Sequence, residues 1–271
     1  MYRRPFTVLA LTLALFCKLA TPAAADDLPR LDERTALMLG AKRLRIGILS
    51  FDYGIIEQVS IGSDPPAWAA RAFLPVFIPN LHLKAQVLQR GPVALAVQGA
   101  AYYLSMNQEG SASGSLFVLP ASGFGSFRLH QRVWLHGELT YIFASASGAG
   151  DINEAGINGQ ASTRAGQAGT ILELRLTRIF SITAMGRYQF YAGPLAFKGS
   201  SMLDPNTVVT INGQALQRVE HPWEAVAGVA FLWKHLHLIV GVGYGYYFVP
   251  GVDLPYPSRG FVPDGSLSLV L

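Results

Sequence analysis

The sequence predicts an all-β protein, a transmembrane antiparallel up-and-down β-barrel of about 12 strands, with 10 strands as the alternative. Three observations lead to this fold class. Long stretches alternate between apolar and small or polar residues, the apolar face ends in aromatic residues, and tight turns alternate with long connections. The outward face of a soluble sheet is polar. A membrane barrel is instead apolar outside and polar inside, and that is the arrangement predicted here.

Residues 223–250 show the alternation most clearly. From 223 to 233 the odd positions are apolar, and from 236 to 248 the even positions are apolar. A period of two places each class of side chain on its own face of a strand. Aromatic girdles mark both interfaces of a membrane barrel, so five aromatic residues are predicted to lie at the interfaces: Trp223, Trp233, Tyr244, Tyr246 and Phe248.

Residues 1–25 are predicted to be a secretory signal peptide, and residues 26–271 a single barrel domain. Arg3 and Arg4 precede an apolar stretch at 6–16, and three alanines at 23–25 form an A-x-A cleavage site. Cleavage removes the single cysteine, together with three basic residues and no acidic ones. The mature chain is then close to neutral, which gives no support for nucleic-acid binding.

The strands are predicted in chain order. After a lead-in at 26–34, residues 35–61 form either one long strand or three shorter ones, at 35–39, 43–51 and 59–61. The three-strand version, with Tyr53-Gly54 as a turn, gives the count of 12. Residues 68–79 are interrupted by prolines and are expected to form a loop or short helix. The later strands are regular: 81–87, 93–103, 117–129, 133–143, 172–176, 180–190, 223–233, 236–248 and 266–271.

Short and long connections alternate along the chain. Tight turns are expected at 90–91, 130–132, near 178 and at 234–235, and long loops at 105–113, 146–167, 193–222 and 250–263. Outer-membrane barrels have short periplasmic turns and longer extracellular loops. The alternation therefore predicts that both ends of the barrel domain lie on the periplasmic side.

The signal peptide, the paired strands and the terminal strand with Leu267, Leu269 and Leu271 together resemble outer-membrane β-barrel proteins of Gram-negative bacteria. The stretch 52–59, DYGIIEQV, is similar to a hairpin common in such barrels. The resemblance covers the mature chain. It implies an outer-membrane location, contact with lipid, and recognition of the terminal strand by the barrel-assembly machinery. The family usually ends in an aromatic residue, and here the last residue is Leu271.

Alternation also assigns charged residues to the lumen. Seven are basic and three are acidic, and a positive excess in an open lumen favours anions. The residues are Arg43, Arg45, Lys84, Arg128, Glu138, Glu173, Arg175, Arg187, Glu224 and Lys234.

No catalytic residue, metal site or cofactor is predicted. His136 and Glu138 are two apart on one strand face, as are His235 and His237, but no third metal ligand is evident. Hydrogen-bonded lumen side chains explain both pairs more simply. No G-x-S-x-G motif is present. The G-x-G-x-G run at 241–245 lies within a strand, where glycine makes room for side chains from across the barrel.

Three functions follow as hypotheses. The first is a monomeric outer-membrane barrel of structural or narrow-pore type, anion-preferring if open, with no catalytic role. The second is an outer-membrane hydrolase that acts on lipid with a lumen or rim histidine such as His136. The third is a surface receptor or adhesin that uses the loops 146–167 and 193–222, although their Gly, Ala and Ser content makes them poor rigid recognition surfaces.

Overall fold

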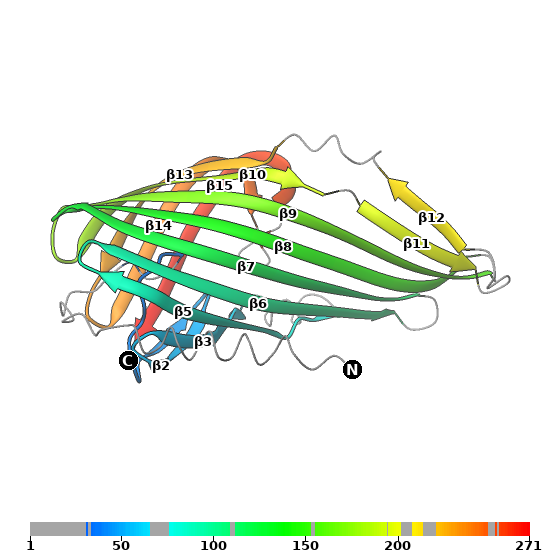
Figure 1. The fold of residues 1–271 in the computed structure, drawn as a ribbon, viewed down its shortest axis with the longest axis horizontal. Helices are drawn as coiled ribbons and strands as arrows, with labels where there is room; N and C mark the ends of the chain where they lie inside the picture. Colours follow the sequence, from blue (N-terminus) through cyan, green and yellow to red (C-terminus); the bar gives the residue numbers. More distant parts are fainter. Residues whose placement is uncertain are drawn as a thin grey trace.

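The chain forms a closed antiparallel barrel of 12 strands, which confirms the predicted fold class and the larger strand number. The computed structural model describes residues 31, 34–65, 76–108, 112–152, 155–193, 195–201, 208–213, 221–248, 253 and 255–271. The ring runs β1-β2-β3-β5-β6-β7-β8-β9-β10-β13-β14-β15, and β15 pairs with β1 to close it (Figure 1).

The first six ring strands are β1 (Leu44–Gly47), β2 (Phe51–Ile56), β3 (Val59–Ser63), β5 (Asn80–Arg90), β6 (Val93–Gln108) and β7 (Ala112–His130). The other six are β8 (Val133–Ile152), β9 (Ala155–Arg175), β10 (Phe180–Ala192), β13 (Trp223–Leu232), β14 (Leu236–Phe248) and β15 (Pro255–Val270). Three short strands lie outside the ring: β4 (Val76–Phe77) on β6, β11 (Leu195–Ser201) on β9, and β12 (Val208–Gly213) on β11.

The barrel wall is uneven in height. Strands β1, β2 and β3 have 4, 6 and 5 residues, whereas β7, β8 and β9 have 19, 20 and 21. The long strands continue past the rest of the ring toward β11 and β12 (Figure 1). The turns between β5 and β6, β7 and β8, β9 and β10, and β13 and β14 lie at the opposite end, because every ring strand is antiparallel to its neighbours. These four are called the short turns.

Three predicted loops are largely strand, and a fourth contains strands. Most of 146–167 belongs to β8 and β9, which pair without a register shift from Val133↔Leu174 to Ile152↔Ala155. Most of 250–263 belongs to β15, most of 105–113 belongs to β6 and β7, and 193–222 contains β11 and β12. The stretches 105–113 and 146–167 are rich in Gly, Ala and Ser, whereas 250–263 contains four prolines. Small residues on both faces leave no apolar alternation to identify a strand, and proline is uncommon within strands.

The predictions for residues 35–61 are only partly correct. Three short strands do occur, but residues 35–39 are not in the wall, and Tyr53 and Gly54 lie within β2 rather than in a turn. Gly54 is glycine because the Gly40 carbonyl oxygen lies against it, so that a Cβ atom would collide with that oxygen. Among the described residues, no helix is long and apolar enough to cross a membrane.

The two faces of the wall differ as predicted by alternation. On β8, Leu135, Leu139 and Tyr141 are exposed on the outside, whereas His136 and Thr140 are buried. The same pattern recurs on the other long strands, and it makes the outer surface of the barrel largely apolar.

The aromatic residues predicted at the interfaces divide between the two faces. Trp223, Trp233 and Tyr244 are exposed on the outer surface, and Tyr246 is half-buried. Phe248 is 4% exposed, so its placement at the interface is wrong. Gly245 has φ +141° and the β14–β15 register shifts between Tyr246 and Phe248, which breaks the alternation at this end of β14.

Candidate functional site in the barrel lumen

The lumen contains a cavity of about 510 Å³ that is lined from all sides of the ring. Its charged lining includes four cationic side chains and six carboxylates, together with His82. The cations are Arg34, Arg45, Lys84 and Arg187, and the carboxylates are Asp52, Asp64, Glu138, Glu224, Asp253 and Asp264. A lumen of this composition needs pairing between opposite charges, because an isolated buried charge is strongly unfavourable.

The first charge cluster follows one row across four neighbouring strands. Glu138 on β8 is in register with Gly169 on β9, Gly169 with Arg187 on β10, and Arg187 with Glu224 on β13. The guanidinium of Arg187 lies 3.8 Å from the Glu138 carboxylate and 3.7 Å from that of Glu224. Because Gly169 has no side chain, the Glu138 carboxylate lies over it and reaches Arg187 across β9.

Asp253 completes this cluster from the connection between β14 and β15. Its carboxylate accepts a hydrogen bond of 2.8 Å from Nη1 of Arg187, and its carbonyl oxygen accepts one of 2.6 Å from Gln167. Burial, together with the negative charge of Asp64, raises the pKa of the Asp253 carboxyl to about 6, although the charge of Arg34 opposes this shift. Arg187 also stacks over the Phe248 ring, at 5.1 Å from its centroid.

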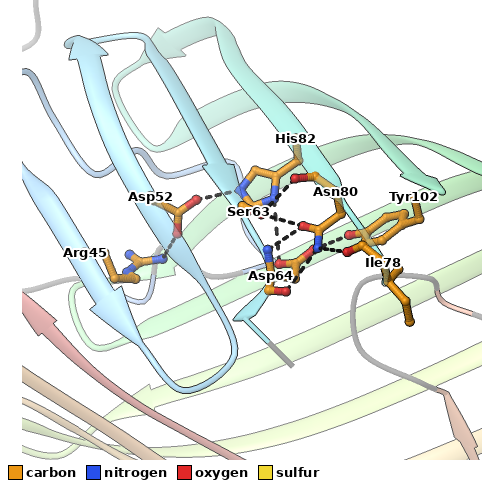
Figure 2. Close-up of polar contacts among 8 residues, drawn as sticks. All are labelled: Arg45, Asp52, Ser63, Asp64, Ile78, Asn80, His82 and Tyr102. Atoms are coloured by element: carbon orange, nitrogen blue, oxygen red, sulfur yellow. Dashed lines mark hydrogen bonds and ion pairs between the residues drawn. The ribbon is translucent and has the colours of Figure 1, made fainter. Parts of the chain in front are cut away.

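A second row has the same construction and joins the short strands to the rest of the wall (Figure 2). Arg45 on β1 is in register with Asp52 on β2, Asp52 with Gly62 on β3, and Gly62 with His82 on β5. Arg45 Nη1 lies 3.3 Å from one Asp52 oxygen, and His82 Nε2 lies 2.6 Å from the other. The Asp52–His82 contact passes over Gly62, where a Cβ atom would collide with both side chains.

This second row continues to the start of the β3–β5 connection (Figure 2). The other His82 nitrogen, Nδ1, lies 3.7 Å from Asp64, and the Tyr102 hydroxyl donates to the second Asp64 oxygen. Asn80 fixes the Asp64 backbone with hydrogen bonds of 2.6 and 3.1 Å. The cluster therefore links β1, β2, β5 and β6 through side chains alone.

A third cluster surrounds His136, which is 1% exposed. Ser126 and His136 are register partners, and the Ser126 hydroxyl lies 2.8 Å from His136 Nδ1. His136 Nε2 lies 3.5 Å from Glu173, whose other oxygen accepts hydrogen bonds from Ser181 and Arg175. The residue types match a Ser-His-Glu triad. The group is almost inaccessible, and the Ser126 oxygen already accepts a hydrogen bond from the Ala36 amide.

The chain itself crosses the lumen before it enters β1. We call Leu31 and residues 34–39 the lumen segment. Three wall side chains bind its backbone: Ser126 accepts from the Ala36 amide at 2.9 Å, Gln86 donates to the Ala36 carbonyl at 2.8 Å, and Lys84 donates to the Leu37 carbonyl at 2.8 Å. No strand pairing joins this segment to the ring in the part of the chain that the structure describes.

Two apolar contacts hold the ends of the lumen segment. Leu31 packs with Ala230 and Leu232 of β13, and Leu37 lies in a cluster with Phe124 and the start of β6. These wall residues lie within a few positions of the short turns between β13 and β14, β5 and β6, and β7 and β8. The segment therefore crosses the lumen at its short-turn end, and Leu31, Arg34 and Leu39 form part of the cavity wall there.

The charged residues assigned to the lumen by alternation have different surroundings. Glu173 and Arg175 belong to the His136 cluster. Arg43, Arg128 and Lys234 are exposed near strand ends, and Arg128 lies over the Trp134 ring. The remaining residues line the cavity: Arg45, Lys84, Glu138, Arg187 and Glu224.

Several cavity residues escaped the prediction because they do not lie in the strands that alternation identified. Arg34, Asp64 and Asp253 belong to connections that enter the lumen, and Asp52 was placed beside a turn. The alternation of Phe51, Asp52 and Tyr53 could have indicated that the Asp52 side chain faces the lumen. With these residues included, the predicted positive excess is wrong for the described lining of the cavity.

The second histidine pair lies at the beginning of β14. His235 Nδ1 lies 2.9 Å from the Val270 carbonyl oxygen at the end of β15, and His237 is buried. Within the described residues, no group of three or more His, Cys, Asp or Glu side chains is placed to hold a metal ion.

Gly62→Ala is expected to lower the free energy of unfolding by about 1–3 kcal/mol, because the added methyl group must displace Asp52 and His82 from a buried contact. Gly99→Ala is the matched control, since a Cβ atom there has nothing within 4 Å. Urea denaturation in detergent micelles measures both variants. Equal stability of the two variants would show that the Asp52–His82 contact does not hold the short strands.

No protein-family model and no curated protein sequence matches the chain. The similarity of the chain to solved structures is weak. The transport unit of the autotransporter AIDA-I from Escherichia coli has a TM-score of 0.35 and 11% identity, covering 100% of this chain and 98% of that one. CdiB from Escherichia coli has a TM-score of 0.30 and 9% identity, covering 84% of this chain and 62% of that one. CdiB from Acinetobacter baumannii has a TM-score of 0.18 and 12% identity, covering 84% of this chain and 50% of that one. Similarity at this level carries no inference about function.

Proposed function

We propose that the chain is an integral outer-membrane barrel with a narrow, charge-lined lumen and no catalytic role. The observation that carries this proposal is the inverted distribution of side chains. Charged groups are paired inside the ring, whereas large apolar side chains cover its outside, with Leu139 63% and Phe261 83% exposed. Soluble monomers rarely expose continuous apolar surface of this extent, and a lipid environment accounts for it.

The strand lengths support one orientation. A tilted strand needs about 9–11 residues to cross the hydrocarbon layer. Strands β7, β8 and β9 are about twice as long, so their ends nearest the short turns lie in the bilayer and their far ends project beyond it. The short turns then lie in the periplasm and β11 and β12 outside the cell, as in other outer-membrane barrels.

The charged lining of the cavity supports a preference for cations. Six carboxylates and four cations line the described part of the cavity, and a ring of acidic side chains selects cations in a conducting pore. This reverses the anion preference that alternation alone predicted. The proposal retains lipid as the surrounding partner, a monomeric barrel, and recognition of the terminal strand during assembly.

The Ser126–His136–Glu173 group supports a second candidate, a hydrolase. We favour a structural role, because nothing larger than water can approach a serine that is 2% exposed and bonded to the chain itself. In the proposed role, Ser126 accepts a hydrogen bond from the Ala36 amide and is held in place by His136. His136 in turn lies against the Glu173 carboxylate.

Leu139→Arg tests the membrane location. An arginine at the bilayer midplane of a barrel costs about 2–4 kcal/mol, and one near the interface about 0–1 kcal/mol. Leu139 is six residues beyond the start of β8, near the proposed midplane, whereas Ser147 lies on the same face of β8 but closer to its far end. Denaturant unfolding from lipid vesicles should therefore show a large loss for Leu139→Arg and a small one for Ser147→Arg. Equal losses would contradict a lipid-facing outer surface.

His136→Ala tests the hydrolase alternative. The wild-type protein and this variant are expected to show the same background turnover of phospholipid and lipid A in detergent, because the serine is inaccessible. Retained heat-modifiable mobility on gels checks that the variant is folded. Turnover by the wild type that disappears in His136→Ala, with the fold intact, would replace the structural role with a catalytic one.

A further inference from the structure

We propose that the lumen segment is a displaceable plug, held in a binding site of the barrel wall, and that its release opens the lumen to the periplasm. The inference rests on the proposed function for the direction of opening and for the ions that pass. The binding site itself is defined by contacts within the protein.

The segment is attached in a way that permits release. The ring strands are held by ladders of backbone pairs, but the described part of the lumen segment makes none. Its backbone is bound by the side chains of Gln86, Lys84 and Ser126. Loss of these three contacts leaves every strand pair of the barrel in place.

The recognition elements are those of a peptide-binding site. Two apolar contacts, for Leu31 and for Leu37, lie on different sides of the lumen, with β13 and β14 at one and β6 and β7 at the other. Next to the second contact, polar side chains bind the peptide groups of Ala36 and Leu37. Apolar anchors combined with hydrogen bonds to the main chain provide affinity for one segment in one register.

A hinge lies where the segment joins the wall. Gly40 has φ +93° and Lys42 φ +57°, and the Lys42 amide donates to the Gly54 carbonyl at 2.7 Å. The chain is therefore fixed to β2 from residue 42 onward. The lumen segment lies on the other side of Gly40, the residue type that most readily changes its backbone conformation.

The position of the segment explains why its release opens the cavity. Leu31, Arg34 and Leu39 form the cavity wall at the short-turn end of the barrel. When this wall leaves, the cavity opens at that end. Arg34, 3.9 Å from Glu138, leaves with it. The described lining that remains then has six carboxylates and three cations, which strengthens the preference for cations.

Peptide binding in trans tests the site without a membrane. The barrel that lacks residues 31–39 is purified in detergent and titrated with a fluorescent peptide of residues 26–39. Saturable binding is expected from the anisotropy. The matched control peptide carries aspartate in place of Leu31 and Leu37, and it should bind at least about 10-fold more weakly, the factor that corresponds to one buried leucine. Equal binding of the two peptides overturns the plug.

Conductance in planar bilayers tests the opening. The full-length barrel is expected to be closed, and the barrel without residues 31–39 to carry a cation-selective current that the wild-type peptide lowers and the control peptide does not. A current that ignores the wild-type peptide overturns the plug but leaves the pore intact. Specific peptide binding with no current supports the site and removes the pore from the proposed function.

A second variant keeps the test valid if the shortened barrel does not fold. Leu31→Asp with Leu37→Asp in the full chain introduces charge at both apolar contacts while leaving the ring strands unchanged. Heat-modifiable mobility reports its folding. This double variant is expected to conduct, and a folded double variant that stays as closed as the wild type contradicts the proposal.

Discussion

A barrel wall is one residue thick, so every second side chain must face the lumen. Each charged group there needs a partner, because burial of an unpaired charge is strongly unfavourable. The protein meets this constraint with rows of side chains that run across neighbouring strands. In two of these rows a glycine, Gly62 or Gly169, separates an acid from its cationic or histidine partner, and the two side chains meet above it. Two of the three charge clusters in the lumen are built in this way.

These rows of side chains also explain how a ring of strands of very different length stays closed. Strand β1 pairs with β15 over a short stretch, from Arg45 to Gly47, and backbone hydrogen bonds of Leu44 and Ile48 extend it by one residue at each end. Arg45 is bound to Asp52, and Asp52 to His82 on β5, so side chains connect the short strands to the taller wall. The lumen segment adds contacts between opposite sides of the barrel, with Leu31 against β13 and Leu37 near β6. Closure of the ring therefore depends on Arg45, Asp52 and His82, whereas occupancy of the lumen depends on other inward-facing side chains such as Lys84, Gln86 and Ser126.

Alternation in the sequence was sufficient for the two faces of the wall. It favoured the correct number of 12 strands over 10, but it misplaced the first strands, because residues 35–39 are not in the wall and Tyr53 lies within β2. It assigned Glu138, Arg187 and Glu224 to the lumen, but it could not pair them, because their contact depends on the register of four strands. It missed Arg34 and Asp253, since a connection that folds into the lumen carries no periodic signal. The far halves of β8 and β9 were missed for a different reason. Their small residues are compatible with a strand, but they give no apolar face to detect.

The central claim is that the outer surface of the ring faces lipid and that its inner surface is filled by the protein. Nitroxide labels placed one at a time at residues 139–142 of β8, in protein reconstituted into vesicles, test it directly. Collision with oxygen, which is concentrated in the bilayer, and with a water-soluble nickel chelate is measured for each label. The account predicts high oxygen and low nickel accessibility at 139 and 141, and low accessibility to both reagents at 140 and 142. High nickel accessibility at 139 and 141 would contradict it.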